Sequence, residues 1–112
     1  KGAKGFGEFA VDHFSLGPKH NHQATPADHP LFLLLADIAA EHDVPVDIHM
    51  ELIPKQMPLP EGLRSPPNPK TLEPNLAAFE RLLAHNRKAK IIWSHAGWCN
   101  TGYRTVEITA AL

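Results

Sequence analysis

Three short stretches of the chain each present one side chain that can bind a metal ion. These side chains are Glu8, His49 and His95. The two histidines follow apolar runs rich in β-branched residues, which are typical of buried strands. Glu8 stands in a short strand-like stretch, Gly5–Ala10, whose glycines would allow close approach of backbone or ligand. Enzymes built on parallel strands place their chemistry at the carboxyl ends of those strands, so we expect the three side chains to converge there.

One carboxylate and two imidazoles form a ligand set that suits Zn²⁺ or a similar divalent ion. The imidazoles supply neutral nitrogen donors, the carboxylate offsets the charge of the ion, and an open coordination position would hold water. Such an ion lowers the pKa of its bound water towards about 7, which makes hydroxide available at neutral pH. The sequence therefore predicts a divalent metal cofactor, with zinc as first choice, held by Glu8, His49 and His95.

Each of these residues also has a purely structural interpretation. A single histidine at a strand end is more often a hydrogen-bonded rim residue than a ligand, and Glu8 could instead pair with a lysine or arginine. Strand alternation places Asp47 and Glu51 on the same face as His49. Asp47 lies deeper in the strand, so we expect it to make structural hydrogen bonds beside the site.

Further candidates lie in loops. The sequence His20-Asn21-His22 has the spelling of a metal-binding pair, but it follows Gly17-Pro18, which indicates a loop. We therefore expect His22 to be exposed or to contact substrate. Trp98 follows the third strand and could either line the substrate pocket or be an ordinary packing residue. Cys99 has no base partner nearby in the sequence, so a catalytic thiol is not expected. Surface positions are expected for His13, His29, His42 and His85.

Two helical patterns separate the three strand-like stretches. Thr25–Asp28 combines a capping hydroxyl, a proline at the first helical position and an acid in the first turn, which predicts a helix from there to about His42. A second helix is predicted to open at Pro74, and a third could begin at Tyr103. This order of strands and helices favours a parallel sheet of α/β class.

A proline-rich segment lies between the second strand and the second helix. Leu52–Thr71 contains six of the 11 prolines of the chain, so neither a helix nor a central strand can persist there. A loop of about 20 residues inside a small domain is usually functional or disordered. We expect this loop to help cover the substrate.

The composition limits the classes of function. A hydrophobic fraction of 43% and a charged fraction of 21% are ordinary for a globular protein. The formal net charge of −1 gives no electrostatic reason to expect nucleic acid or a membrane surface as partner, which leaves a small-molecule substrate. A single cysteine excludes an internal disulfide and fits a cytoplasmic protein best. A membrane span needs about 20 consecutive apolar residues, and the sequence contains no such run. It also shows no signal-peptide pattern.

Three motifs together resemble the amidohydrolase superfamily of metal-dependent hydrolases, above all its amidohydrolase-related and TatD-like branches. They are Gly7-Glu8-Phe9, Pro45–Glu51 and Trp93–Gly97, and the resemblance covers nearly the whole chain. It implies that residues 1–112 form one domain, a partial TIM (β/α)8 barrel with about three parallel strands and two to three helices. It also implies that Glu8, His49 and His95 bind the metal on the fourth, fifth and sixth strands of that barrel, in a hydrolase where activated water attacks a carbonyl or phosphoryl centre.

The family pattern is incomplete in this sequence. Its first-strand His-x-His pair and its eighth-strand aspartate have no counterpart on a strand here, so no general base is assigned within this chain. The general base is expected in a missing segment, and the chain alone is expected to be incomplete as a hydrolase. Because the chain begins at Lys1 without a methionine, we expect a fragment whose exposed sheet edges are covered by self-association or by a missing segment. Two alternatives stay open: a metal-dependent decarboxylase of the amidohydrolase-related branch, and a non-catalytic binding or assembly module.

Overall fold

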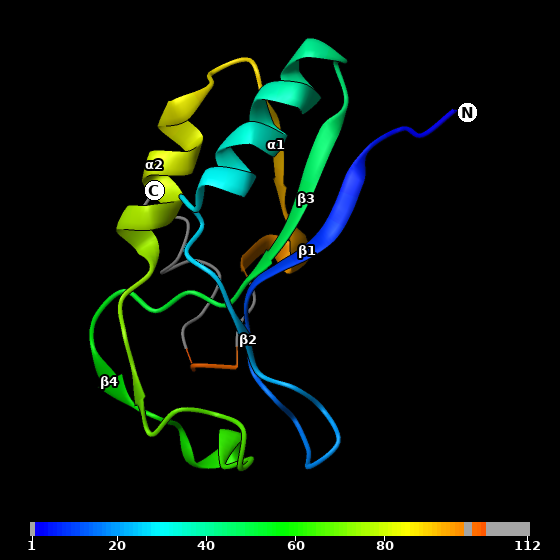
Figure 1. Cartoon of the computed structure of the whole chain (residues 1–112). Coiled ribbons are helices and arrows are strands. Elements are labelled where there is room, and N and C mark those ends of the chain that lie inside the picture. Colours follow the sequence, from blue (N-terminus) through cyan, green and yellow to red (C-terminus); the bar gives the residue numbers. More distant parts are fainter. Residues whose placement is uncertain (1, 98–99, 103–112) are drawn as a thin grey trace.

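The main sheet of the computed structural model, which describes residues 2–97 and 100–102, has four strands in the order β2-β1-β3-β6 (Figure 1). Its strands are β1 (Phe6–His13), β2 (Gln23–Ala24), β3 (Pro45–Met50) and β6 (Lys90–Trp93). β1, β3 and β6 run parallel, and β2 pairs antiparallel with the end of β1. The α/β class and the parallel core of the sheet are confirmed. Within the described residues the sheet is open and does not close into a barrel.

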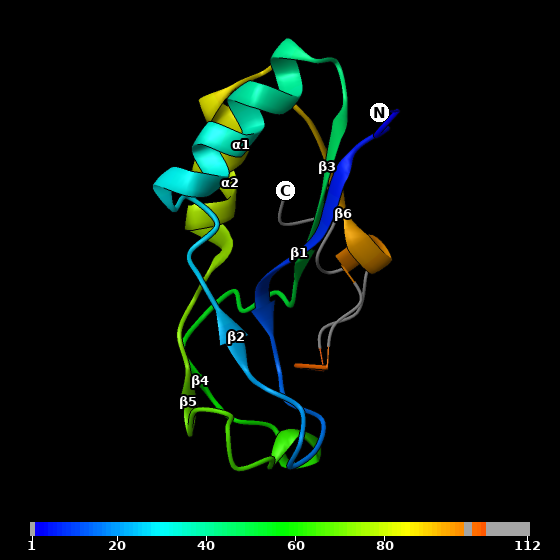
Figure 2. The same ribbon diagram turned by 45° about the vertical axis from the view of Figure 1, so that its right-hand side comes forward.

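Two helices, α1 (Pro30–Glu41) and α2 (Leu76–His85), lie on one side of this sheet (Figure 2). α1 begins later than the sequence predicts. The backbone N–H of Thr25 donates to the carbonyl of Val11 (2.7 Å), so Thr25 continues the pairing with β1 and does not cap the helix. The cap is His29, whose Nδ1 accepts from the N–H of Leu31 (3.2 Å). His29 thus has a structural role that a plain surface position would not give it.

The two faces of β3 have different surroundings. Val46, Ile48 and Met50 alternate along the strand and are buried in the main apolar core beneath the helices. Phe79 of α2 belongs to the same core and packs against the ring of Trp93, with centroids 5.0 Å apart. Because side chains of a strand point alternately to opposite faces, Asp47 and His49 fall on the face away from the helices.

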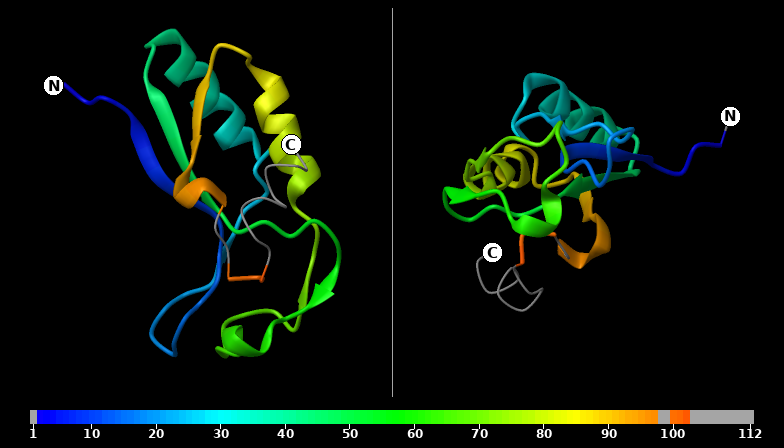
Figure 3. Two further views of the ribbon diagram at one scale, coloured as in Figure 1. Left: turned by 180° about the vertical axis from the view of Figure 1, so that it is seen from behind. Right: turned by 90° about the horizontal axis from the view of Figure 1, so that it is seen from below.

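The proline-rich segment is ordered by a small core of its own. It contains two short antiparallel strands, β4 (Met57–Pro58) and β5 (Thr71–Leu72), and one 3-10 turn, η1 (Glu61–Leu63). Its apolar side chains pack around the residue that follows β1 in a cluster formed by Phe14, Ile53, Leu63 and Leu72. The segment lies at the end of the molecule opposite the turn between α1 and β3 (Figure 3).

A buried amide fastens this segment to the loop after β1. Asn68 accepts from the N–H of Ser15 (2.7 Å) and donates to the carbonyls of Ser15 (2.8 Å) and Leu63 (2.7 Å). The hydroxyls of Ser15 and Ser65 also share a hydrogen bond of 2.7 Å. As the prolines predict, no long helix or central strand forms in this segment. The short pairing of β4 with β5 and the packing of side chains order it instead.

None of the helices in the described ranges is long and apolar enough to cross a membrane. The third helix expected from Tyr103 lies outside the described residues, as do Trp98 and Cys99.

Candidate metal centre

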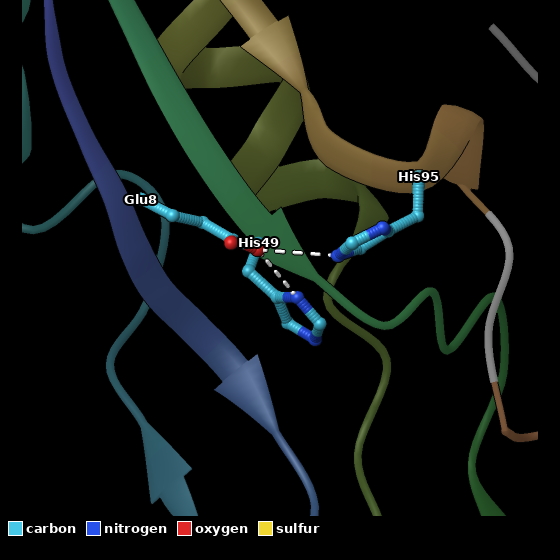
Figure 4. Close-up of side chains that lie close together, drawn as sticks. All are labelled: Glu8, His49 and His95. Atoms are coloured by element: carbon cyan, nitrogen blue, oxygen red, sulfur yellow. Dashed lines mark hydrogen bonds and ion pairs between the residues drawn. The ribbon is translucent and has the colours of Figure 1, made fainter.

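Glu8, His49 and His95 meet on the sheet face that the helices leave open (Figure 4). Glu8 comes from β1, His49 from β3, and His95 from the 3-10 turn η2 (Ser94–Gly97) directly after β6. Glu8 Oε1 lies 2.8 Å from His49 Nδ1 and 3.3 Å from His95 Nε2. One potential ligand atom from each residue lies within 4.8 Å of the other two. The structure thus brings together the three side chains that the strand pattern selects.

Strand register explains the convergence. Ala10 of β1 is paired with His49, and Ile48 of β3 is paired with Trp93, so the three strand ends lie at one level. Beside Glu8, β1 approaches β3 so closely that a Cβ on Gly7 would lie 2.7 Å from the Cβ and carbonyl oxygen of Asp47. Gly7 also has φ +142°, which side chains rarely adopt. A glycine is therefore required where Glu8 enters the site.

The turn that carries His95 is tied to β3. The indole Nε1 of Trp93 donates to the carbonyl of Met50 (2.8 Å), and the hydroxyl of Ser94 donates to Asp47. Asp47 therefore makes the structural hydrogen bond expected of it. His95 itself has φ 61°, in the left-handed region that residues other than glycine seldom occupy. Such conformations cluster at ligand-binding sites, where the surrounding contacts hold them in place.

The three side chains line a cavity of about 340 Å³ together with Ala10 and His13. The side chains of Glu8 and His95 are 41% and 52% exposed, whereas that of His49 is 18% exposed. The cavity is open to solvent on the sheet face, and no residue of the proline-rich segment lines it. The expected role of that segment as a substrate cover is thus not seen in the lining of this cavity.

His13 is not the surface histidine that the sequence indicates. It is the last residue of β1 and is half-buried, with Nδ1 2.9 Å from His49 Nε2 and Nε2 2.9 Å from His20 Nε2. Strict alternation from Glu8 and Ala10 would put Asp12 beside them and His13 on the opposite face. The pairing of β1 with β3 shifts between Ala10 and Asp12, and this irregularity turns His13 into the cavity.

These hydrogen bonds run in one direction when the rings are neutral. The N–H of Leu16 donates to His20 Nδ1 (3.2 Å), so His20 carries its proton on Nε2 and donates to His13. His13 then donates from Nδ1 to His49 Nε2, and His49 donates from Nδ1 to Glu8. The backbone donor at one end and the carboxylate acceptor at the other require the same tautomers.

The charge balance of the cluster is unusual because histidines, and no lysine or arginine, are the ionic partners of its carboxylates among the described residues. Burial would raise the pKa of Glu8, but the hydrogen bond and charge of His49, with those of His95, outweigh it and hold that pKa below its usual value. Burial lowers the pKa of His13, and the neighbouring His49 and His20 lower it further. Both shifts favour the forms that bind metal, an ionised carboxylate at Glu8 and a neutral imidazole at His13.

Asp12 lies behind the cluster. Burial, together with the nearby charge of Glu51, raises its pKa to about 6, although a hydrogen bond from Asn75 (3.0 Å) and the neighbouring His22 act in the opposite direction. His22 Nε2 lies 3.7 Å from Asp12 Oδ1, and the ring of His22 stacks on Phe14 with centroids 5.6 Å apart. His22, a candidate substrate contact, does not line the cavity of the metal cluster.

No protein-family model matches the sequence, and no match is found among curated proteins or solved structures.

Proposed function

We propose that this chain provides the metal centre of a metal-dependent hydrolase, with Glu8, His49 and His95 as ligands of a divalent ion such as Zn²⁺. The observation that carries the proposal is the convergence of one carboxylate and two imidazoles at an open cavity, from two neighbouring parallel strands and the turn directly after a third. Zinc sites that catalyse hydrolysis use three such protein ligands and leave one coordination position free.

The spacing of the ligand atoms supports an ion of this size. Zinc–nitrogen and zinc–oxygen bonds of about 2.1 Å in a tetrahedron place neighbouring ligand atoms about 3.4 Å apart. Glu8 Oε1 is 2.8 Å from His49 Nδ1 and 3.3 Å from His95 Nε2, and the three ligand atoms all lie within 4.8 Å of one another. The ion would take the place of the proton shared by Glu8 and His49.

Bound there, the metal would supply Lewis acidity and lower the pKa of a coordinated water. The chain itself would fix the ligands through strand register, through the Ser94–Asp47 hydrogen bond and through the Trp93–Met50 hydrogen bond. The open side of the cavity would admit a small molecule with a carbonyl or phosphoryl centre.

The arrangement of the elements is also compatible with part of a (β/α)8 barrel. Along the chain α1 lies between β1 and β3, and α2 lies between β3 and β6. Both helices lie on one side of the sheet, and the polar face of β3 lies on the other. In such barrels the helices form the outer ring and the chemistry lies at the carboxyl ends of the strands. We propose the amidohydrolase superfamily as the source of this segment because its motifs fall on these strand ends, and a covering segment or a second copy as partner of the open sheet.

Hydrolysis of p-nitrophenyl acetate and p-nitrophenyl phosphate, with Zn²⁺ and with a chelator, tests this proposal. Because no general base is assigned in this chain, we expect slow, zinc-dependent hydrolysis of one of these two activated substrates. Glu8→Gln and His95→Gln should abolish it, while the exposed control His42→Gln retains it. Rates that are the same with zinc, with chelator and in these variants would refute the hydrolase proposal. Release of carbon dioxide from aromatic acids, in place of hydrolysis, would identify the decarboxylase alternative.

A further inference from the structure

A second group of potential ligands lies on the other side of the His49 ring. His13 Nδ1 and His49 Nε2 are 2.9 Å apart, and each lies 3.9 Å from Glu51 Oε1. Three ligands of a tetrahedral zinc ion are separated by about 3.4 Å, which falls between these distances. We call Glu8, His49 and His95 the outer group, and His13, His49 and Glu51 the inner group.

Glu51 gives the inner group a reason to bind a cation. Glu51 is only 1% exposed, and its carboxylate accepts hydrogen bonds from the backbone N–H (2.9 Å) and the side-chain amide (3.0 Å) of Asn100. These donors are neutral, and within the described chain its ionic partners are the rings of His13 and His49. Burying a carboxylate without a full positive charge beside it is costly, and a divalent ion at this point would supply that charge.

The tautomer of His49 favours the inner position. Because His49 donates from Nδ1 to Glu8, its free electron pair is on Nε2, which faces His13 and Glu51. A histidine that binds a metal through one nitrogen and donates from the other to a carboxylate is the usual arrangement in metal proteins. An ion in the inner group would thus keep the Glu8–His49 hydrogen bond, whereas an ion in the outer group would replace it.

We propose that His13, His49 and Glu51 form a second position for a divalent ion of the zinc or cobalt class, exclusive with the outer position because both use the ring of His49. A neutral imidazole has one free electron pair, so it serves one ion at a time. In the inner position the ion displaces the proton on His13 Nδ1, which moves to Nε2 of the same ring, and the exposed His20 then turns its own N–H to solvent. The proposal shares His49 with the proposed function, but it stands or fails on different residues.

Two double variants separate the positions. Glu8→Gln with His95→Gln removes the outer group, His13→Gln with Glu51→Gln removes the inner group, and His49→Gln disables both. The control is Glu41→Gln with His42→Gln, an acid and a histidine that are exposed at the end of α1. Each purified chain is titrated with Co²⁺ to obtain stoichiometry, and with Zn²⁺ while the ¹⁵N resonances of the histidine rings show which nitrogen binds the metal.

We expect one equivalent of metal for the wild type, for the control and for both double variants, and none for His49→Gln. In the variant without the outer group, Zn²⁺ should shift Nε2 of His49 and Nδ1 of His13. Absence of metal in that variant, with one equivalent in the variant without the inner group, would overturn the inner position and leave the proposed function intact. The reverse result would refute the outer ligand set and support the inner position.

Two further results would overturn the exclusive arrangement. Two equivalents in the wild type would show that both positions fill at once, and failure of the wild type to bind any metal would refute both positions. If the buried Glu51→Gln change prevents folding, as circular dichroism would show, His13→Gln alone replaces it, because His13 is only half-buried.

Discussion

The two faces of β3 have opposite environments, an apolar core on one side and a polar cluster on the other. On the helix side, Val46, Ile48 and Met50 are each 1–2% exposed and pack into one apolar core. On the other side, hydrogen bonds from neighbouring segments and ion pairs with histidines hold Asp47, His49 and, just past the strand end, Glu51. The same six residues of backbone therefore support both a core and a polar cluster.

The two faces contribute differently to stability. Burying one side chain such as Ile48 stabilises the fold by about 1.5–3 kcal/mol. A partly or fully buried carboxylate without a lysine or arginine beside it costs free energy unless its hydrogen bonds are complete. The helix face thus stabilises the fold, and the polar face uses part of that stability to hold charged groups ready for a ligand.

The largest expected effect comes from the helix face. Ile48→Ala should lower the free energy of unfolding by about 2–5 kcal/mol, because it removes buried methyl groups and leaves a cavity beneath the helices. Urea denaturation monitored by circular dichroism measures the loss. The matched control is Ile92→Ala on β6, where the side chain is 48% exposed, and its effect should stay within about 0.5 kcal/mol. Equal effects at the two positions would show that the helix face is not the main source of stability.

Asp12, a buried acid behind the polar cluster, should make the stability of the fold depend on pH. The pKa of Asp12 is raised from 3.8 to about 6, so the folded state holds its proton more tightly than the unfolded chain. The resulting stabilisation is present below pH 3.8 and is lost as pH rises through about 6, a change of about 3 kcal/mol. Asp12→Asn should remove this loss. Urea denaturation in chelator at pH 4 and pH 7 checks it: parallel changes in the variant and the wild type would contradict the assignment.

Binding of a metal ion at the polar face should stabilise the folded state. Zn²⁺ at 100 times its dissociation constant should raise the free energy of unfolding of the wild type by about 2.7 kcal/mol. His49→Gln should gain nothing, because both ligand groups need this ring. Thermal denaturation with increasing Zn²⁺ measures the gain, and His42→Gln serves as the control that keeps it. A gain of the same size in His49→Gln would place the ion elsewhere in the chain.

The smallest effect is expected at the contact between the helices, away from both faces. Hydrogen bonds from His85 (2.9 Å) and Asn86 (2.8 Å) hold the pKa of Asp37 below its ordinary value. Its contribution to stability is therefore present above the unfolded pKa and falls as pH drops through the folded one. Asp37→Asn should slightly reduce stability at pH 7 and have no effect at pH 2, as measured by thermal denaturation at the two values. An equal loss at both pH values would mean that charge is not involved.

Much of the architecture could be predicted because the spacing of apolar residues and the positions of the prolines indicate the same strand, helix and loop boundaries. The apolar run before His49, the apolar positions of α1 and the prolines of the segment 52–71 lead directly to the elements observed, and the meeting of Glu8, His49 and His95 follows from parallel strands that end at one level. Their role as metal ligands remains a prediction. The predicted start of α1 was wrong by about four residues, because the backbone of Thr25 pairs with Val11 and Thr25 does not cap the helix.

The inner group could not be predicted in the same way. His13 reaches the cavity through a register shift in β1, and a bulge leaves little trace in a single sequence. Glu51 could be assigned to the face of His49 by alternation, but its burial depends on Asn100, which is 49 residues further along the chain. The long-range contact, and not the local pattern, turns an ordinary acid into a buried one.

The amide of Asn68 has a consequence for how the molecule opens. Two of its three hydrogen bonds join the loop after β1 to the proline-rich segment, and the third is with Leu63 in the same segment. Both Asn68 and Ser15 are buried. We therefore expect the two loops to open together, as one cooperative unit. Proteases and hydrogen exchange should therefore find residues 52–71 no more accessible than the turn that carries His20. The loop that carries His20, a hydrogen-bond partner of His13 in the cavity wall, is therefore expected to open only when the contacts of Asn68 break, although Asn68 does not line the cavity.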